Sequence, residues 1–505
     1  MKILTSVQTR KAEQIAFNMG ISGERLMENA GSAAVRILRE KYKLENLDAV
    51  VVVGQGNNGG DGYVVARKLR EYGARVTVVM AMGISTTRDS SIMHKKAITS
   101  GVTVMNYYDN SLMASTAMDN ADIIVDAIFG IGFHGIADRD ISEIIEKINL
   151  SKAKKIALDI PSGVQADTGE VLGAAVKADL TISFIGYKPC AFEYPASEYC
   201  GEVSVVSIGI DDRNIIDYSG EIIDKKTALS FLKKIPKNAH KGVKGTALII
   251  GGSFGMAGAP MISAKAAMRS GAGLVKVCTT KDTYPAAAPM LPEAVFVPKE
   301  GRDGFLSSED ITVDLFKNVN SLLIGPGMGY NDTTVGAVAK AATLAKVPTV
   351  VDADGLNAIS AEPQILNSNF LVAITPHPGE MARLIGKSVD EIQKNRISTA
   401  MSFAKAYGVI TVLKGAYTVV AMPSGRVYIN VTGNEGMATA GSGDMLAGMI
   451  AAFLANGIYP ENAVLAAVCL HGAAGDKTAS KLGVRSILAS DMIEQLPYIF
   501  SSGEL

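Results

Sequence analysis

Runs of apolar residues recur along the chain, and amphipathic stretches separate them. In the first half the runs cover Asp48–Val53, Arg75–Met80, Asp122–Ile128, Lys155–Ile160, Leu180–Ile185 and Val203–Ile208. The stretch Tyr63–Tyr72 instead has apolar residues at the three-to-four-residue spacing of a helix. Continuous apolar runs that alternate with helices predict a parallel sheet covered on both faces.

The pattern weakens after Ile210 and then restarts. Residues 211–241 contain charged pairs and a short helix candidate, Lys225–Lys234, so they form either a boundary or a connector packed on one domain. The next strand candidates are Thr246–Ile250, Leu274–Cys278, Ser321–Ile324, Thr349–Asp352, Phe370–Ile374, Ile410–Leu413 and Val427–Ile429, with helices expected at Met261–Arg269 and Met445–Asn456. We therefore predict two α/β domains, residues 1–215 and 225–505.

Composition narrows the class of protein. With 48% apolar and 20% charged residues, the 505-residue chain can bury large cores. A net charge of −1 without a basic block argues against nucleic acid or an anionic membrane as partner. The apolar stretch Met445–Leu454 is too short to span a bilayer. Four scattered cysteines form no zinc pattern and favour a reducing compartment, so we expect a soluble, cytoplasmic protein.

Polar side chains follow three strands of the predicted first sheet. The glycine-rich stretch Gly54–Gly62 reads Gly-Gln-Gly-Asn-Asn-Gly-Gly-Asp-Gly, and later strands end in Asp-Ala-Ile-Phe-Gly-Ile-Gly and Asp-Ile-Pro-Ser-Gly. Because parallel strands share one carboxyl edge, we expect five side chains to meet there: Asn58, Asp61, Asp126, Asp159 and Ser162. Glycines admit an anion, whereas carboxylate and amide oxygens suit a hard cation or a proton transfer.

Each residue also has a plainer interpretation. Asp126 or Asp159 alone could be a helix cap or a loop hydrogen bonder. His134 could be an ordinary loop histidine. Asp159 is the candidate acid/base group, because it follows an apolar strand and would be partly desolvated.

These three motifs together resemble the NAD(P)H-hydrate epimerase family, over roughly residues 1–211. The resemblance implies a Rossmann-like three-layer domain that interconverts the R and S epimers of hydrated NADH and NADPH. It implies that Asn58, Asp126 and Ser162 ligate a potassium ion. It assigns to the hydrated dinucleotide the residues Asn57, Asn58, Gly59, Gly60, Asp61, Gly130, Ile131, Gly132, Phe133, His134, Gly135, Ile136 and Asp159.

Three further motifs carry the signal of the second domain. Small residues in Gly433–Gly443 leave backbone amides open at the start of a helix, which creates an anion hole. Asp444 follows directly and suits a proton acceptor, or else is only an N-cap. Lys414 ends a strand and either neutralises phosphate or is solvated. In Thr375-Pro-His-Pro-Gly-Glu380 the glutamate either reaches Mg²⁺ or caps the next helix.

In combination these motifs resemble the ribokinase-like superfamily and, within it, the ADP-dependent NAD(P)H-hydrate dehydratases, over roughly residues 225–505. The resemblance assigns Ala259, Gly327, His377 and Asp444 to the hydrated cofactor. It assigns to the adenine nucleotide the residues Lys414, Gly415, Ala416, Tyr417, Thr418, Asn434, Glu435, Gly436, Met437, Ala438, Thr439, Ala440, Gly441, Ser442 and Gly443.

The resemblances imply a fused repair enzyme for NADH hydrate and NADPH hydrate. Phosphorylation by ADP with Mg²⁺ would turn the hydroxyl on carbon 6 of the ring into a good leaving group, with Asp444 as base. The epimerase would supply the S epimer that the dehydratase accepts. Resemblance alone also implies a homo-oligomer.

Two other functions stay open at this point. One is a small-molecule kinase of the ribokinase-like superfamily fused to a Rossmann-like regulatory domain, whose product would be a stable phosphate ester. The other is a nucleotide-sensing binding protein, which would bind its ligands without turnover.

Overall fold

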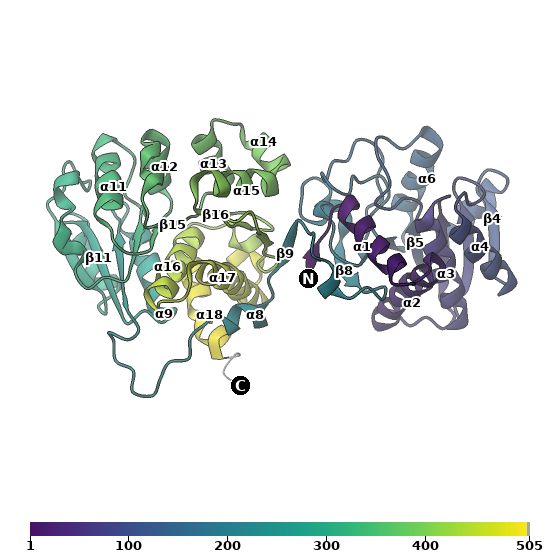
Figure 1. Ribbon diagram of the computed structural model, residues 1–505, viewed down its shortest axis with the longest axis horizontal. Coiled ribbons are helices and arrows are strands. Elements are labelled where there is room, and N and C mark those ends of the chain that lie inside the picture. The colour runs from purple at the N-terminus through teal and green to yellow at the C-terminus, as the bar shows by residue number, and fades with distance from the viewer. Residues whose placement is uncertain (502–505) are drawn as a thin grey trace. The chain divides into compact units, whose positions relative to one another are not determined.

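The computed structural model describes residues 1–501, which divide into two compact units, Met1–Glu221 and the chain from Ile222 onward (Figure 1). Among residues 1–501 no helix is both long and apolar enough to cross a membrane. Each unit contains its own parallel sheet, as the alternating pattern of the sequence predicts.

The first unit is a three-layer α/β domain. Its sheet is entirely parallel and runs in the order β4 (Thr103–Asn106), β3 (Arg75–Met80), β2 (Asp48–Val53), β5 (Ile123–Ala127), β6 (Lys154–Leu158), β7 (Leu180–Phe184) and β8 (Glu202–Val206). Its helices are α1 (Ser6–Asn18), α2 (Gly23–Lys41), α3 (Asn57–Glu71), α4 (Arg88–Thr99), α5 (Ser111–Asp119), α6 (Arg139–Leu150) and α7 (Ser197–Cys200).

Alternate residues of each strand enter different cores. Val51 and Val53 of β2 pack in the core formed with α2, α3 and α4. Val50 and Val52 pack in a second core with α5 and α6. Successive side chains of a strand point to opposite faces, so a strand with a core on both sides must be apolar throughout. This explains the unbroken run of valines.

The second unit has the sheet order β18 (Val427–Ile429), β17 (Val419–Ala421), β16 (Ile410–Leu413), β15 (Leu371–Ile374), β14 (Thr349–Val351), β13 (Ser321–Ile324), β10 (Thr246–Ile250), β11 (Leu274–Thr280) and β12 (Val295–Lys299). The strands from β10 to β16 are parallel, and β17 and β18 continue the sheet antiparallel.

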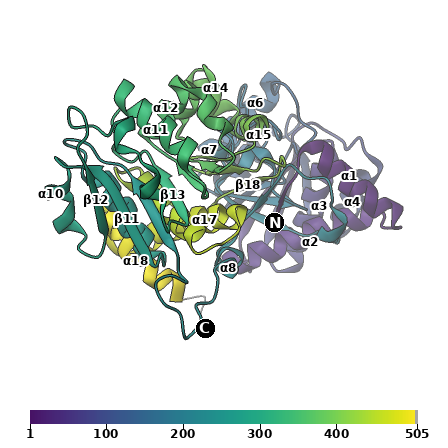
Figure 2. The same ribbon diagram turned by 60° about the vertical axis from the view of Figure 1, so that its left-hand side comes forward.

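Helices cover both faces of this sheet (Figures 1 and 2). One face carries α9 (Gly258–Arg269), α16 (Ser442–Ala455), α17 (Pro460–Leu482) and α18 (Ala489–Ser501). The other carries α11 (Asp332–Leu344), α12 (Asp354–Ala361), α13 (Pro378–Ile385), α14 (Val389–Lys394) and α15 (Arg396–Tyr407). The short α8 (Lys225–Ser230) packs on α17, so this part of the predicted connector belongs to the second unit.

Helix starts are where the predicted elements were wrong. Helices expected from Tyr63, Met261 and Met445 begin instead at Asn57, Gly258 and Ser442. All three early turns are rich in glycine and other small residues, which have no apolar side chains to reveal the helical period. Asn57, Asn58 and Asp61 therefore lie in the first turns of α3 and not in a loop.

Helices α9 and α16 pack closely against each other in the second unit. A Cβ on Gly448 of α16 would lie 2.2 Å from the backbone oxygen of Ser263 in α9. Glycine at this position thus sets the distance between the two helices, and any larger residue must push them apart.

We expect Gly448→Ala to lower the free energy of unfolding of the second unit by about 1–3 kcal/mol, because the added methyl group overpacks the helix contact. The matched control is Gly336→Ala in the middle of α11, where the nearest atom to an added Cβ is 3.8 Å away. That change should stabilise by about 0.5–1 kcal/mol, since alanine is the better helix former. Denaturant titration of both variants measures the two effects, and equal effects would contradict the packing argument.

Candidate active sites

Four predicted side chains of the first unit meet at the carboxyl edge of its sheet. They lie at the carboxyl ends of β2, β5 and β6, where Asp126 is still part of β5. These strands are neighbours, and the order of strands reverses between β2 and β5. Ligands of open parallel sheets bind at such a reversal. The four side chains are those of Asn58, Asp126, Asp159 and Ser162.

Asp126 and Ser162 form a buried pair. Ser162 Oγ donates to Asp126 Oδ1 at 2.6 Å, and the Ser162 amide donates to Oδ2 at 2.8 Å. Burial raises the pKa of Asp126 to about 6 even though these hydrogen bonds favour the carboxylate. Asn58 Nδ2 donates to the Phe129 carbonyl at 2.8 Å, which holds the amide beside the pair.

One oxygen of this group lacks a partner. Asn58 Oδ1 is buried and accepts no hydrogen bond from any of residues 1–501. An unsatisfied buried amide oxygen costs free energy unless a ligand binds it. A carboxylate, an amide oxygen and a hydroxyl together form an oxygen-only set, which suits a hard cation.

Asp159 is held in an unusual backbone conformation. Its φ is +66°, in the left-handed region that aspartate tolerates better than most residues. Oδ2 accepts from the Ile131 amide at 3.1 Å, and Oδ1 forms an ion pair with Lys188 Nζ at 2.8 Å. The carboxylate is thus tied to the Gly130–Ile136 segment and to a buried cation.

The sequence interpretation missed Lys188. Its side chain is only 1% exposed, and its ammonium also donates to the carbonyl of Phe184 at 2.7 Å. The available signal was a lysine inside the mostly apolar stretch Phe184–Phe192. A buried lysine needs a partner, and the strand-end carboxylate provides it.

Two more carboxyl groups lie in the electrostatic range of Asp159. Burial, with the nearby Asp159 and Glu13, raises the pKa of Asp61 well above its usual value. Burial and Asp159 also raise the pKa of Glu13, which α1 supplies. The site therefore combines one ion-paired carboxylate with two groups that tend to hold a proton.

The other predicted ligand residues of this unit differ in exposure. Asn57 is exposed, as are Gly132, His134, Gly135 and Ile136, whereas Gly59 and Gly60 are buried. A Cβ on Gly59 would lie 2.1 Å from the Gly54 carbonyl oxygen. This glycine is therefore required for close packing of α3 on the preceding turn, which the phosphate interpretation of the loop did not foresee.

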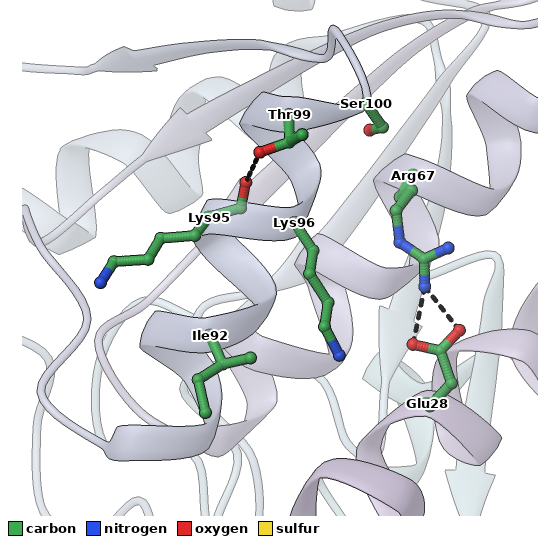
Figure 3. A pocket seen from close by; sticks show the side chains of 7 residues that line it. All are labelled: Glu28, Arg67, Ile92, Lys95, Lys96, Thr99 and Ser100. Atoms are coloured by element: carbon green, nitrogen blue, oxygen red, sulfur yellow. Dashed lines mark hydrogen bonds and ion pairs between the residues drawn. The ribbon is translucent and has the colours of Figure 1, made fainter.

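A separate hollow of about 640 Å³ lies between α2, α3 and α4 (Figure 3). Its lining includes Lys95, Lys96 and Arg67, and the last donates to Glu28 at 2.6 Å. The four strand-end side chains described above do not line this hollow.

In the second unit a partly buried lysine, with 18% of its side chain exposed, joins several strand ends. Lys414, after β16, donates to Asp352 Oδ1 at 2.7 Å and lies 3.8 Å from Glu380 Oε2. Thr375 also donates to Asp352 Oδ1 at 2.7 Å. The alternative of a solvated Lys414 is therefore wrong. Asp352, which the sequence offers only as the last residue of the strand candidate Thr349–Asp352, is the anchor of the group.

Asp444 lies at the third position of α16, whose N-cap is Gly441, so the N-cap alternative for Asp444 is wrong. Burial raises the pKa of Asp444 to about 7, and the charge of Asp352 adds to the rise while Lys414 opposes it. A Cβ on Gly443 would lie 3.2 Å from Lys414 Nζ, so the ammonium touches the start of the helix. A base, a cation and open amides thus adjoin one another.

His377 and Glu380 close a capping box at the start of α13. His377 Nδ1 accepts from the amides of Gly379 and Glu380 at 3.0 and 3.3 Å, and Glu380 Oε2 accepts from the His377 amide at 2.7 Å. The capping interpretation of Glu380 is therefore confirmed. Burial raises the pKa of Glu380 to about 7, and the charge of Asp352 adds to the rise while Lys414 opposes it.

Several of the remaining predicted residues contact one another. A Cβ on Gly327 would lie 3.2 Å from that of Ala259, so these two adjoin each other. Thr418 Oγ1 donates to the Gly415 carbonyl at 2.9 Å, and Asn434 Oδ1 accepts from the Gly436 amide at 3.1 Å. Buried Arg396 donates to the carbonyls of Leu413 and Lys414, which fixes the segment that carries the lysine.

The described residues contain no group of three or more His, Cys, Asp or Glu side chains placed to hold a metal ion. Glu380 and Asp352 are the carboxylates of the second site that face Lys414. A Mg²⁺ ion that arrives with a nucleotide needs only one or two carboxylates, because phosphates and water complete its coordination.

Comparison with known families identifies both units. The family described as YjeF-related protein N-terminus matches residues 23–190, and the family described as NAD(P)H-hydrate dehydratase matches residues 247–498. The second unit is similar to the crystal structure of an ADP/ATP-dependent NAD(P)H-hydrate dehydratase from Bacillus subtilis co-crystallised with ATP and Mg²⁺. The two are 32% identical with a TM-score of 0.50, over 56% of this chain and 99% of the other.

A ribokinase-like superfamily protein from Enterococcus faecalis has a similar structure, at 26% identity and a TM-score of 0.50 over 57% of this chain and 98% of the other. The predicted ribokinase-like fold is confirmed. Over the full chain, a bifunctional NAD(P)H-hydrate repair enzyme from Moorella thermoacetica is 36% identical, covering 95% of this chain and 92% of its own. This chain belongs to the family of bifunctional NAD(P)H-hydrate repair enzymes.

Proposed function

We propose that the first unit interconverts the R and S epimers of hydrated NADH and NADPH. We propose that the second dehydrates the S epimer with ADP, releasing AMP and phosphate. One observation supports the second step most directly. Asp444, with a pKa raised to about 7, stands on the first turn of α16 beside open amides and the Lys414 ammonium.

The dehydration follows from the order of these groups. Asp444 accepts the proton of the ring hydroxyl. The hydroxyl oxygen attacks the β-phosphorus of ADP, and the bond from that phosphorus to the bridging oxygen breaks, so AMP leaves. The amides of the Ala440–Gly443 segment face the negative charge of the moving phosphoryl group, and Lys414 adds a positive charge. Phosphate then leaves carbon 6, and loss of the proton from carbon 5 restores the ring double bond.

Lys414 is held for this role by its partners. Asp352 and Glu380 fix its ammonium beside Gly443. Mg²⁺ bound to the nucleotide would neutralise phosphate charge, and Glu380 is the residue we assign to hold it, directly or through water.

Epimerisation at carbon 6 requires that one bond of that carbon breaks and forms again on the other face. A proton must move to or from the ring hydroxyl in either direction. We assign this transfer to Asp159, with Lys188 as its ion-pair partner and Asp61 as a second acid. Asn58, Asp126 and Ser162 fit a potassium ion, because Asn58 Oδ1 is buried and unsatisfied within residues 1–501. That ion would hold the Asp126 carboxylate in its charged form.

The reaction is tested by supplying purified R and S hydrates with ADP and following the return of NADH absorbance. We expect repair of S to need ADP but not potassium, and repair of R to need both. Replacing potassium by tetramethylammonium should slow only the R hydrate. Accumulation of a stable phosphate ester would support the kinase alternative, and binding without turnover would support the sensor.

Asp159→Asn should slow epimerisation by about 100-fold or more, because the amide cannot accept the proton. Dehydration of the S hydrate by the same preparation should stay at the wild-type rate. The control is Asp119→Asn, an exposed carboxylate at the end of α5. Normal epimerisation by Asp159→Asn would remove this residue from the mechanism.

Asp444→Asn should abolish dehydration and yet stabilise the second unit. The folded-state pKa of about 7 lies above the ordinary value of 3.8, so the charged form is disfavoured in the fold. Stability from this group is present at low pH and is lost as pH rises through 7. At pH 8 the variant should therefore gain on the order of 1 kcal/mol.

For the same reason, wild-type dehydration should rise with pH and level off above about 7, where Asp444 is ionised. The control is Asp314→Asn, an exposed carboxylate in the same unit, which should change neither stability nor rate. Thermal unfolding of the wild type and both variants at pH 5 and pH 8 measures the stability effect. A lower stability of Asp444→Asn than of the wild type at pH 8 would contradict burial of the Asp444 charge.

A further inference from the structure

Helix α17 contacts both ends of the proposed nucleotide site. Its segment His471–Asp476 reads His-Gly-Ala-Ala-Gly-Asp. Neither the sequence motifs nor the mechanism uses this helix. It nevertheless makes side-chain hydrogen bonds to the Thr432–Met437 segment and to the Ser442 start of α16.

Asp476 holds the first of these segments. Its Oδ2 accepts from the Gly433 amide at 2.9 Å, and its Oδ1 accepts from Asn434 Nδ2 at 3.0 Å. Two turns earlier in the helix, the Cys469 carbonyl accepts from Thr432 Oγ1 at 2.8 Å. Three consecutive residues of the segment are therefore fixed to one helix.

His471 holds the second segment. Its Nε2 lies 3.3 Å from Ser442 Oγ, and both residues are buried. Burial lowers the pKa of His471 to about 4, with the charge of Lys414 a smaller cause, so the ring is neutral near pH 7. A neutral ring exchanges one hydrogen bond with the hydroxyl and places no positive charge of its own at the start of α16.

Two glycines of the helix allow the contact. A Cβ on Gly472 would lie 2.6 Å from the backbone of Thr432, and one on Gly475 would lie 2.2 Å from Met437 Sδ. The segment therefore lies directly on the helix backbone. Residues three and four apart share a helix face, so Gly472, Gly475 and Asp476 present one surface to it.

We propose that His471 and Asp476 are positioning residues of the dehydratase. Asp476 orients the segment that receives the nucleoside end of ADP, and His471 orients Ser442 where the phosphoryl group moves. The five-residue separation along one rigid helix, about 7.5 Å of rise, sets the distance between the two parts of the site. This inference rests on the proposed nucleotide site of the second unit.

The two contacts predict different kinetic defects. Asp476→Ala should raise KM for ADP about tenfold with little change in kcat, because it weakens binding of the nucleoside end of ADP, which does not react. His471→Ala should lower kcat about tenfold with a smaller change in KM, because Ser442 lies where the phosphoryl group moves. His471→Gln should recover most of its loss, since an amide group can replace the ring nitrogen. Asp476→Asn should recover only part of its loss, since its single amide oxygen can accept one of the two hydrogen bonds.

Ser480→Ala is the matched control. Ser480 is exposed on the same helix, and its hydroxyl donates to the Lys477 carbonyl within that helix at 2.8 Å. The epimerisation rate of each preparation reports whether the first unit is intact. Wild-type KM and kcat in both alanine variants would overturn the proposal, as would equal losses in KM and kcat without rescue by the amide variants.

If Asp476→Ala or His471→Ala does not give a folded second unit, Gly472→Ala tests the proposal instead. Its added methyl group displaces Thr432 and should raise KM for ADP, whereas an unchanged KM overturns the proposal. A wild-type chain that turns ADP over into a stable phosphate ester would overturn the dehydratase function and still allow these KM values to be measured. Failure of the two ideas is therefore distinguishable.

Discussion

Both candidate sites depend on one constraint, that parallel strands in register bring their carboxyl ends to a single edge of the sheet. Asn58, Asp126 and Asp159 are separated along the chain, yet hydrogen bonds through Phe129 and Ile131 connect their surroundings. The same holds for Asp352, Thr375 and Lys414 in the second unit. The strands are otherwise apolar, so the chemistry is confined to Asp126 near the end of β5 and to the few residues that follow the strands.

Each edge contains a lysine, buried in the first unit and partly buried in the second, that is paired with a buried aspartate. Lys188 pairs with Asp159 in the first unit, and Lys414 pairs with Asp352 in the second. A buried ion pair is costly to form and more costly to break, so its main effect is to fix positions. In each unit a further carboxyl group, Asp61 or Asp444, lies near the pair with its pKa raised. In each unit one carboxyl group is charged because a lysine pairs with it, and a second is disfavoured in its charged form. Chemically identical groups can therefore have different roles.

The sequence was informative where the signal is local. Strands with unbroken apolar runs, such as Asp48–Val53 and Thr246–Ile250, were predicted with the observed bounds. The convergence of Asn58, Asp126, Asp159 and Ser162 was predicted from the carboxyl edge that parallel strands share. What the sequence did not reveal depends on three-dimensional packing. The partner of Asp159 lies 29 residues downstream at Lys188, and the contacts of α17 join residues 29 and 43 positions apart. Glycine-rich helix starts were misplaced because they lack apolar side chains. The roles of the individual site residues stay predictions.

The cap of α13 has a consequence for behaviour in acid. His377 accepts two amide hydrogens through Nδ1, so the neutral ring carries its proton on Nε2. Burial and the nearby Lys414 lower the pKa of His377, which means that the fold favours this neutral form. Protonation would turn the acceptor into a donor and place a positive charge at the positive end of the helix dipole. The stability that this group contributes is therefore lost as pH falls. Acid would then break the capping hydrogen bonds at the first turn of α13 and release Glu380. The dehydratase unit would lose this local structure at low pH whether or not Asp444 is protonated.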